Sequence, residues 1–267
     1  MKRLMIILFL GGITAGSSGQ FYVQPSAGYS FSSHPSTLES VFITDNQKTI
    51  FTAPIKYGES LNAGLTVGYE LWDHLMVELN VRQAVYSKHT ATIEEQDLAS
   101  LDNYYIAGFY GEIEYKSPAL QFAPQIGYKV QKDKLSAYFR MGPHFMITRV
   151  TETARTVDYD FVDWRLVPYD VMIRREFKGG LHAGLQADLG FSYDVGSRFQ
   201  VVLDFSTVYN NYVVKEGEIT GYEVEGSDQM ETLDDTDVEI DPYDNRLNHS
   251  NYGLNIGLRY IFGRNKD

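Results

Sequence analysis

The residues of this chain most capable of chemistry are charged side chains that alternate with apolar ones in strand-like segments. Five are acidic and four are basic, so their charges nearly cancel. They are Glu70, Glu78, Arg82, Lys129, Arg140, Asp188, Asp194, Asp204 and Arg259. Gathered in one interior, they could relay protons or ions, or they could fill the interior with ion pairs and hydrogen bonds. The interior of an eight-stranded barrel is just wide enough to be filled by side chains. If these residues lie in such a barrel, we expect them to form a structural polar network and not an ion path.

The spacing of histidine and serine bears on catalysis. Ester hydrolysis needs a serine within reach of a histidine, which a carboxylate orients. On a strand, His-x-Ser places both side chains on one face. Only His34-Pro35-Ser36 has this spacing, and its proline favours a turn. His144 and His182 have no serine two positions away. We therefore expect no catalytic residue and no enzyme, with a lipid-modifying enzyme as the alternative.

An acidic segment near the C-terminus is the one candidate for metal binding. Residues 216–250 include Asp234, Asp235, Asp237, Asp241 and Asp244. Spaced carboxylates suit Ca²⁺, which takes six to eight oxygen ligands, but the EF-hand order with its central glycine is missing. We expect a solvated acidic loop, and the sequence does not decide whether it binds Ca²⁺. No other metal, haem or nucleotide motif occurs, so no cofactor is expected.

The charged residues belong to eight segments in which apolar and polar residues alternate. This period of two is typical of strands with one apolar and one polar face. In residues 61–71, every odd position is apolar and every even position is polar or glycine. The eight segments are Phe21–Phe31, Leu61–Leu71, Leu75–Tyr86, Glu112–Val130, Leu135–Thr148, Leu181–Val195, Phe199–Tyr212 and Asn255–Phe262. The sequence thus predicts an all-β protein.

The connections between these segments alternate in length. Short turns at 72–74, 131–134 and 196–198 separate long connections at 33–60, 88–111, 149–179 and 216–250. This order is typical of an eight-stranded antiparallel up-and-down transmembrane β-barrel with four long extracellular loops and short periplasmic turns. A soluble lipocalin-like barrel is the alternative. Its core would have to form from the polar face, which is too rich in Gly, Asn, Gln and charges. We therefore expect the apolar face to contact lipid.

Four prolines lie within the predicted strands, at positions 25, 118, 124 and 143. A closed barrel has no free edge to tolerate a missing backbone donor. We therefore expect a β-bulge at each of them.

The N-terminus has the features of an export signal. Met1-Lys2-Arg3 precedes an apolar run of about ten residues, too short to span a bilayer, and small residues follow. We expect residues 1–19 to be a signal peptide and residues 20–267 to be the barrel domain. The chain has no cysteine, which excludes disulfides and a lipidated N-terminus. Its net charge of −12 argues against nucleic acid as a partner.

The C-terminal segment has the spacing of a second targeting signal. Asn255, Gly257, Tyr260 and Phe262 have the polar-x-Gly-x-x-aromatic-x-aromatic spacing. This spacing resembles the C-terminal targeting signal of bacterial outer-membrane β-barrels.

With strands and connections placed, the chain resembles the small eight-stranded outer-membrane β-barrel superfamily, the OmpA/OmpX/OmpW-like group. It is most similar to Bacteroidetes-type outer-membrane β-barrel domain proteins, including the PorT-like branch. The similar stretches are Gln20-Phe21-Tyr22-Val23, Gly68-Tyr69, Glu114-Tyr115 through Tyr128-Lys129, and Gly142-Pro143-His144-Phe145.

The resemblance implies an integral protein of the outer membrane of a Gram-negative bacterium, with both termini in the periplasm. The expected partners are outer-membrane lipids, the barrel-assembly machinery during insertion, and a possible envelope protein. A non-enzymatic role through the long loops, in envelope structure or in binding a partner or ligand, is expected. The alternative suggested by the PorT-like branch is a subunit of an outer-membrane secretion or envelope complex.

Overall fold

Eight strands close into an antiparallel barrel in the computed structural model, which describes residues 19–34, 36–44, 47–71, 74–93, 111–162, 165–233, 239–240 and 246–263. Each barrel strand pairs with the next one along the chain, and the last pairs with the first. The barrel strands are β1 (Gln20–Ser32), β4 (Ser60–Leu71), β5 (Leu75–Tyr86), β8 (Ala119–Lys132), β9 (Leu135–Val162), β11 (His182–Asp194), β12 (Phe199–Tyr209) and β18 (Asn251–Ile261). The predicted eight-stranded up-and-down barrel is confirmed.

The two faces of the barrel wall are as the alternation predicts. Leu185 on the outside is 62% exposed, whereas Arg140 on the inside is 0% exposed. Large apolar side chains are exposed around the outer wall, and polar or charged side chains are buried in the lumen. This is the reverse of a soluble barrel, whose interior is the apolar side.

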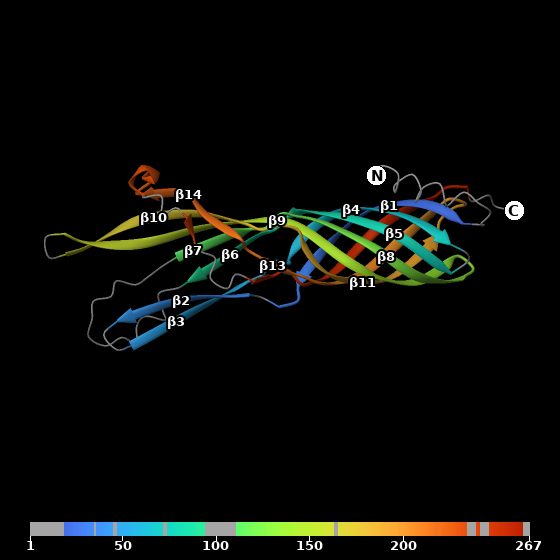
Figure 1. The fold of residues 1–267 in the computed structure, drawn as a ribbon, viewed down its shortest axis with the longest axis horizontal. Helices are drawn as coiled ribbons and strands as arrows, with labels where there is room; N and C mark the ends of the chain where they lie inside the picture. Colours follow the sequence, from blue (N-terminus) through green and yellow to red (C-terminus); the bar gives the residue numbers. More distant parts are fainter. Residues whose placement is uncertain are drawn as a thin grey trace, which may run out of the picture.

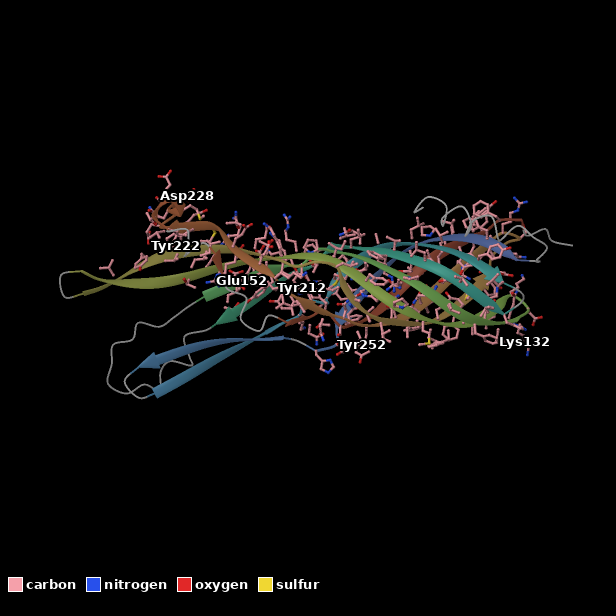
Figure 2. All side chains as sticks on the ribbon, in the orientation of Figure 1. Lys132, Glu152, Tyr212, Tyr222, Asp228 and Tyr252 are labelled. Carbon is pink, nitrogen blue, oxygen red and sulfur yellow. The ribbon has the colours of Figure 1, made fainter. Side chains whose placement is uncertain are left out.

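A second sheet continues from one end of the barrel, opposite the short turns (Figure 1). It forms because β9 runs for 28 residues and keeps pairing after it leaves the barrel. Around it pair β6 (Lys88–Ile93), β7 (Gly111–Lys116), β10 (Arg165–Lys178), β14 (Glu216–Val224), β15 (Ser227–Asp228) and β16 (Glu239–Ile240). We call these strands, with the distal part of β9, the loop-end sheet. Figure 2 shows Lys132 at the turn end of the barrel and Tyr222 and Asp228 in the loop-end sheet on the opposite side.

Smaller elements accompany the two sheets. Two separate hairpin-like pairs are β2 (Ser36–Thr44) with β3 (Gln47–Ile55), and β13 (Asn211–Val213) with β17 (Arg246–Asn248). Helical structure in the described ranges is one 3₁₀ turn, η3 (Met230–Thr232). In that part of the chain, no helix is long and apolar enough to cross a membrane.

The described parts of the long connections therefore contain strands where the sequence predicted loops. Residues 149–179 form most of the β9–β10 hairpin, and β14 in the acidic segment pairs with β10 from Lys178 to Val171. The expectation of a solvated loop over all of 216–250 is thus wrong for its first third. Residues such as Val150, Thr151 and Thr153 favour strands, and pairing that has begun in the barrel can continue along them. The Ca²⁺-binding carboxylates considered at 234–244, and the signal peptide at 1–18, lie outside the described residues.

The predicted bulges at the prolines are wrong. The pairing of β1 with β18 is interrupted at Gln24 and Pro25 and resumes in the same register. On the other side, Pro25 stays paired opposite Leu65 of β4. The β8–β9 ladder lapses in the same way around Pro124 and Pro143. Proline has no backbone N–H, and in a strand that N–H would bond to only one of the two adjacent strands. The loss of this single hydrogen bond does not shift the register. Pro118 instead falls in the break between β7 and β8, which divides the predicted strand Glu112–Val130.

The lumen is filled in three layers. A small apolar cluster lies toward the turn end, formed by Tyr22, Met76, Tyr138, Val202 and Ile261. A larger one lies toward the loop-end sheet, formed by Tyr57, Ala84, Ile113, Tyr115, Ala119, Met146, Val150, Ala154, Tyr212 and Val214. The charged layer around Arg140 lies between them, whereas Glu70, Lys129 and Arg259 lie level with the smaller cluster.

Candidate functional site

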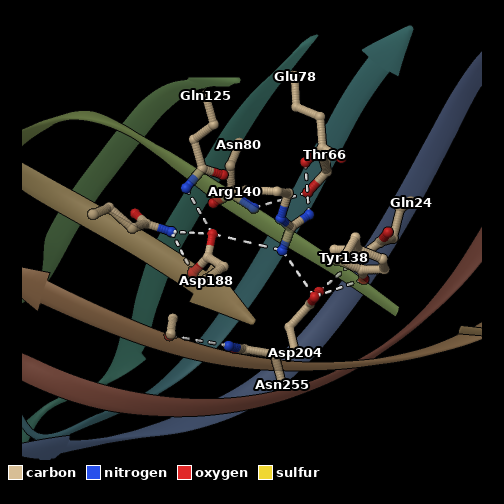
Figure 3. Close-up of polar contacts among 12 residues, drawn as sticks. Gln24, Thr66, Glu78, Asn80, Gln125, Tyr138, Arg140, Asp188, Asp204 and Asn255 are labelled. Carbon is tan, nitrogen blue, oxygen red and sulfur yellow. Dashed lines mark hydrogen bonds and ion pairs between the residues drawn. The ribbon is translucent and has the colours of Figure 1, made fainter. Parts of the chain in front are cut away.

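The buried guanidinium of Arg140 lies at the centre of this charged layer (Figure 3). It projects inward from β9 and meets carboxylates from three other strands. Its Nη1 donates to Glu78 Oε2 on β5 at 2.6 Å, and its Nη2 donates to Asp204 Oδ1 on β12 at 2.8 Å. Asp188 Oδ2 on β11 lies 3.5 Å from Nη2. Glycine at position 127 makes room for this side chain, because a Cβ there would lie 2.7 Å from Arg140 Cγ.

The carboxylates around Arg140 are held by neutral donors as well. Asp204 accepts hydrogen bonds from the Tyr138 hydroxyl at 2.7 Å and from Gln24 Nε2 at 3.0 Å. The Tyr22 hydroxyl donates to Glu78. Hydrogen bonds to a carboxylate replace part of the hydration that it loses on burial.

Asp188 is held in the same manner. It accepts hydrogen bonds from Gln125 Nε2 at 2.7 Å and from Gln186 Nε2 at 3.0 Å. Arg82 Nη2 lies 3.7 Å from its other oxygen, and Arg82 Nη1 donates to Ser206 at 3.1 Å. Two arginines therefore share this buried carboxylate.

A second buried arginine, Arg259, extends the network toward the turn end. Its guanidinium carbon lies 4.3 Å from the centre of the Tyr22 ring, and its Nε donates to Gln24 Oε1 at 3.0 Å. Its terminal nitrogens lie 3.8 Å from Glu70 and 3.9 Å from Glu78. Lys129 Nζ then donates to both oxygens of Glu70 at 2.7 Å.

The structure thus joins eight of the nine charged residues singled out in the sequence. Four cations and four anions form one connected set, so their formal charges cancel. Asp194 lies apart from them, nearer the short turn after β11, where it accepts a hydrogen bond from Gln200 at 2.7 Å. Sequence reasoning missed the neutral partners of the network, which are Tyr22, Gln24, Gln125, Tyr138 and Gln186. Each lies at an inward position of its strand, so the same alternation carried the signal.

An aromatic layer closes the lumen toward the loop-end sheet. The His249 ring stacks on Tyr57 at 5.6 Å and meets Tyr212 edge-on at 5.7 Å. The His182 ring lies 4.6 Å from Tyr212. Burial, aided by the neighbouring His182 and His144, lowers the pKa of His249 to about 3. This histidine is therefore neutral at physiological pH and packs as an aromatic ring.

His144 and His182 are each held by polar contacts to nearby residues. His144 contacts Asn210 through Nδ1 at 2.9 Å and Gln121 through Nε2 at 3.4 Å. Val213 N–H donates to His182 Nδ1 at 3.3 Å. Within the described ranges, no group of three or more His, Asp or Glu side chains has a geometry that could hold a metal ion.

The four residues of the predicted C-terminal signal lie on or next to β18. Asn255 is buried in the lumen, and Gly257 lies against the Pro25 carbonyl of β1. The Tyr260 and Phe262 rings pack against each other at 4.7 Å, and Phe262 N–H donates to Phe21 O at 2.8 Å. These residues thus lie where the last strand pairs with the first. Their role as a targeting signal stays a prediction.

Comparisons with known proteins give structural likeness only. No family model matches the chain, and no curated protein matches its sequence. OprG, an outer membrane protein of Pseudomonas aeruginosa, is 14% identical with a TM-score of 0.46, covering 92% of this chain and 97% of its own. A major outer membrane protein of Thermus thermophilus is 13% identical with a TM-score of 0.40, covering 92% and 100%. The outer membrane protease OmpT of Escherichia coli is 8% identical with a TM-score of 0.42, covering 94% and 99%. At such low identities and TM-scores, the fold is assigned by the strand pairing itself.

Replacement of Arg140 by methionine should destabilise the barrel strongly. The change leaves three carboxylates in the lumen without their shared cation, and breaking a buried ion pair costs about 3–5 kcal/mol. The measurement is urea-induced unfolding of the refolded protein, followed by the gel shift between folded and unfolded barrel. Lys88→Met is the matched control, because it removes a partly exposed ion pair with Glu114 and should cost much less than the loss of Arg140. Equal losses in the two variants would contradict a central role for Arg140.

The burial of His249 predicts a pH dependence of stability. Because its pKa is lowered in the folded protein, the unfolded chain takes up a proton first as the pH falls. The His249 contribution is therefore complete above about pH 6.5 and is lost progressively between about pH 6.5 and pH 3. His249→Phe keeps the ring but removes the titration, so its unfolding free energy should fall less steeply over this range. Parallel pH profiles for parent and variant would contradict a neutral, buried His249.

Proposed function

We propose that this chain is an integral barrel of the outer membrane of a Gram-negative bacterium, and that it is not an enzyme. Its lumen is closed, and its role in envelope structure or in binding a partner or ligand is carried by the loop-end sheet. The observation that carries the proposal is the reversed wall, apolar outside and charged inside. In this assignment the loop-end sheet is extracellular, the short turns and both termini are periplasmic, and the barrel-assembly machinery inserts the chain.

The outer wall supports a position in lipid. Mid-strand apolar side chains such as Leu79, Ile126, Met141, Leu189 and Ile256 are 45–60% exposed. Aromatic side chains flank this band, with Phe21, Phe199, Tyr260 and Phe262 toward the turn end and Phe31, Tyr86, Tyr209 and Tyr252 toward the other end. An apolar band between aromatic girdles is the exterior of outer-membrane barrels. In water, the same surface would far exceed the apolar patches that soluble monomers tolerate.

The filling of the lumen supports a closed barrel. The side chains of Arg140, Glu78 and Asp188 are fully buried, and apolar clusters lie on both sides of them. A water-filled pore would leave such charges hydrated, and they would need fewer partners within the protein. The partners described above therefore favour a structural lumen over an ion path.

The loop-end sheet supports a role in recognition. The wall is committed to lipid and the lumen to its own packing, so the sheet is the part left to meet other molecules. Together with the resemblance to PorT-like proteins, this large structured surface also supports a subunit of an envelope complex.

Leu189→Arg tests the membrane assignment. Leu189 is 48% exposed at the middle of β11, so an arginine there should cost about 2–4 kcal/mol when the barrel is folded in a bilayer. Val167→Arg is the matched control, because Val167 is 44% exposed on β10, beyond the barrel, and its replacement should cost little. The measurement is reversible unfolding from lipid vesicles. A small cost at position 189, or equal costs at both positions, would contradict a lipid-facing wall.

Planar-bilayer recording tests the closed lumen. The purified barrel should show no large, steady conductance, because the charged layer and two apolar clusters occupy the space that ions would need. Rare, small openings that become more frequent in Arg140→Ala would agree with a lumen held shut by this network. Stable porin-like channels in the parent protein would contradict it.

A further inference from the structure

A hollow of about 380 Å³ lies in the loop-end sheet, where β7, β9, β10 and β14 run side by side (Figure 1). The lining that matters here comes from Arg155, Val157, Asp170, Met172 and Glu223, with Glu112 at one side. The volume is in the range of small-molecule sites, which begin near 300 Å³. The hollow lies away from the lumen and from every contact described above.

The strand register shows where the charged residues stand around the hollow. Glu112 of β7 lies opposite Arg155 of β9, Arg155 lies opposite Met172 of β10, and Met172 lies opposite Glu223 of β14. One row further along, Val157 lies opposite Asp170. Arg155 therefore stands on one side of Met172, with Glu112 beyond it, and Glu223 stands on the other side. Asp170 lies next to this row, on the same strand as Met172. The distance between Arg155 and Glu223 is two strand spacings, roughly 10 Å between backbones.

Two neighbouring carboxylates on the same face, Glu114 and Glu176, are each held in ion pairs. Glu114 pairs with Lys88 at 2.5 Å and with Lys116 at 2.8 Å. Glu176 pairs in the same way, at 3.3 Å each with Arg149 and Lys178.

In contrast, Arg155, Asp170 and Glu223 make no ion pair with any residue that the structure describes. Neighbouring backbone fixes the wall, since Glu225 N–H donates to Asp170 O at 2.8 Å and Asp170 N–H donates to Glu225 Oε1 at 2.7 Å. The backbone at Asp170 is thus fixed, and charges of both signs remain available to a ligand.

We infer that this hollow binds a small zwitterion of dipeptide size, with its carboxylate at Arg155 and its ammonium at Asp170 and Glu223. Arginine suits a carboxylate because its guanidinium can donate two parallel hydrogen bonds. The apolar part of the ligand lies over Met172 and Val157. A single amino acid is too short to reach both sides, whereas the charged ends of an extended dipeptide lie far enough apart. This inference rests on the proposed recognition role of the loop-end sheet and gives that role a ligand class.

The test uses alanyl-leucine as probe, with calorimetric titration of the folded, full-length protein in detergent. N-acetyl-alanyl-leucine lacks the ammonium, and alanyl-leucine amide lacks the carboxylate. Each blocked peptide should bind about tenfold more weakly than the zwitterion, because each loses one charged hydrogen-bonding partner. This comparison needs no variant, so it decides the question even where a substitution perturbs folding.

Two variants assign the two ends of the ligand. Arg155→Met should weaken alanyl-leucine about tenfold but leave alanyl-leucine amide unchanged, because the amide has no carboxylate to lose. The double change Asp170→Asn with Glu223→Gln should weaken alanyl-leucine and leave the N-acetyl peptide unchanged. Arg174→Met, and Glu114→Gln with Glu176→Gln, are matched controls on the same face outside the hollow. They should leave the affinity for alanyl-leucine unchanged.

Three results would overturn the inference. They are no binding of alanyl-leucine at millimolar concentration, equal binding of the blocked peptides, and equal losses in the control variants. The last would mean that net charge alone attracts the probe. None of these results bears on the lipid-facing wall, so the Leu189→Arg experiment can still succeed or fail independently.

Discussion

The buried guanidinium of Arg140 has to be matched by carboxylates that only other strands can supply. A charge removed from water costs several kcal/mol unless partners of opposite sign and well-placed donors replace its hydration. Glu78, Asp188 and Asp204 come from β5, β11 and β12, while Arg140 itself comes from β9. Four strands, drawn from residues 75 to 209, are thus held around one ion. The lumen depends on this match, because removal of any one member leaves the others buried and unbalanced.

Closure of the lumen has a consequence for the outside of the barrel. Since the polar face of every strand is used by the network, the apolar face is left exposed around the whole wall. The backbone leaves no unpaired edge in the barrel, because β18 pairs with β1 and β9 pairs with β11. A surface of this kind is stable in lipid, where backbone groups must be paired and apolar side chains face the solvent. In the proposed function, recognition is therefore concentrated beyond the barrel.

The loop-end sheet continues from the barrel, but its two faces need not be an apolar wall outside and a charged lumen inside. Along β9, the inward face passes from Arg140 to Val150 and Ala154, and the outward face passes from Phe139 to Arg155. Outside the barrel, the outward side is charged, which suits water. Glu114 and Glu176 are paired with neighbouring cations there, whereas Arg155, Asp170 and Glu223 make no ion pair with any described residue. The same strand thus forms part of the wall, part of the lumen filling and part of the proposed recognition surface.

The sequence by itself determined the faces and the order of the barrel strands. Alternation with a period of two is a local property, so it can be read along each segment, and short connections force neighbouring strands to pair. The same alternation places the charged residues of different strands in one interior, among them Arg140, Glu78, Asp188 and Asp204. The tertiary structure decided where strands stop and which charges meet. Residues 149–179 have ordinary strand-forming residues and become strands because β9 and β10 can pair there. Likewise, Pro25 needs no bulge, since only one of its two neighbouring strands would have received its N–H. Pairing partners lie far apart along the chain, and a local pattern carries no information about which of them will be in reach.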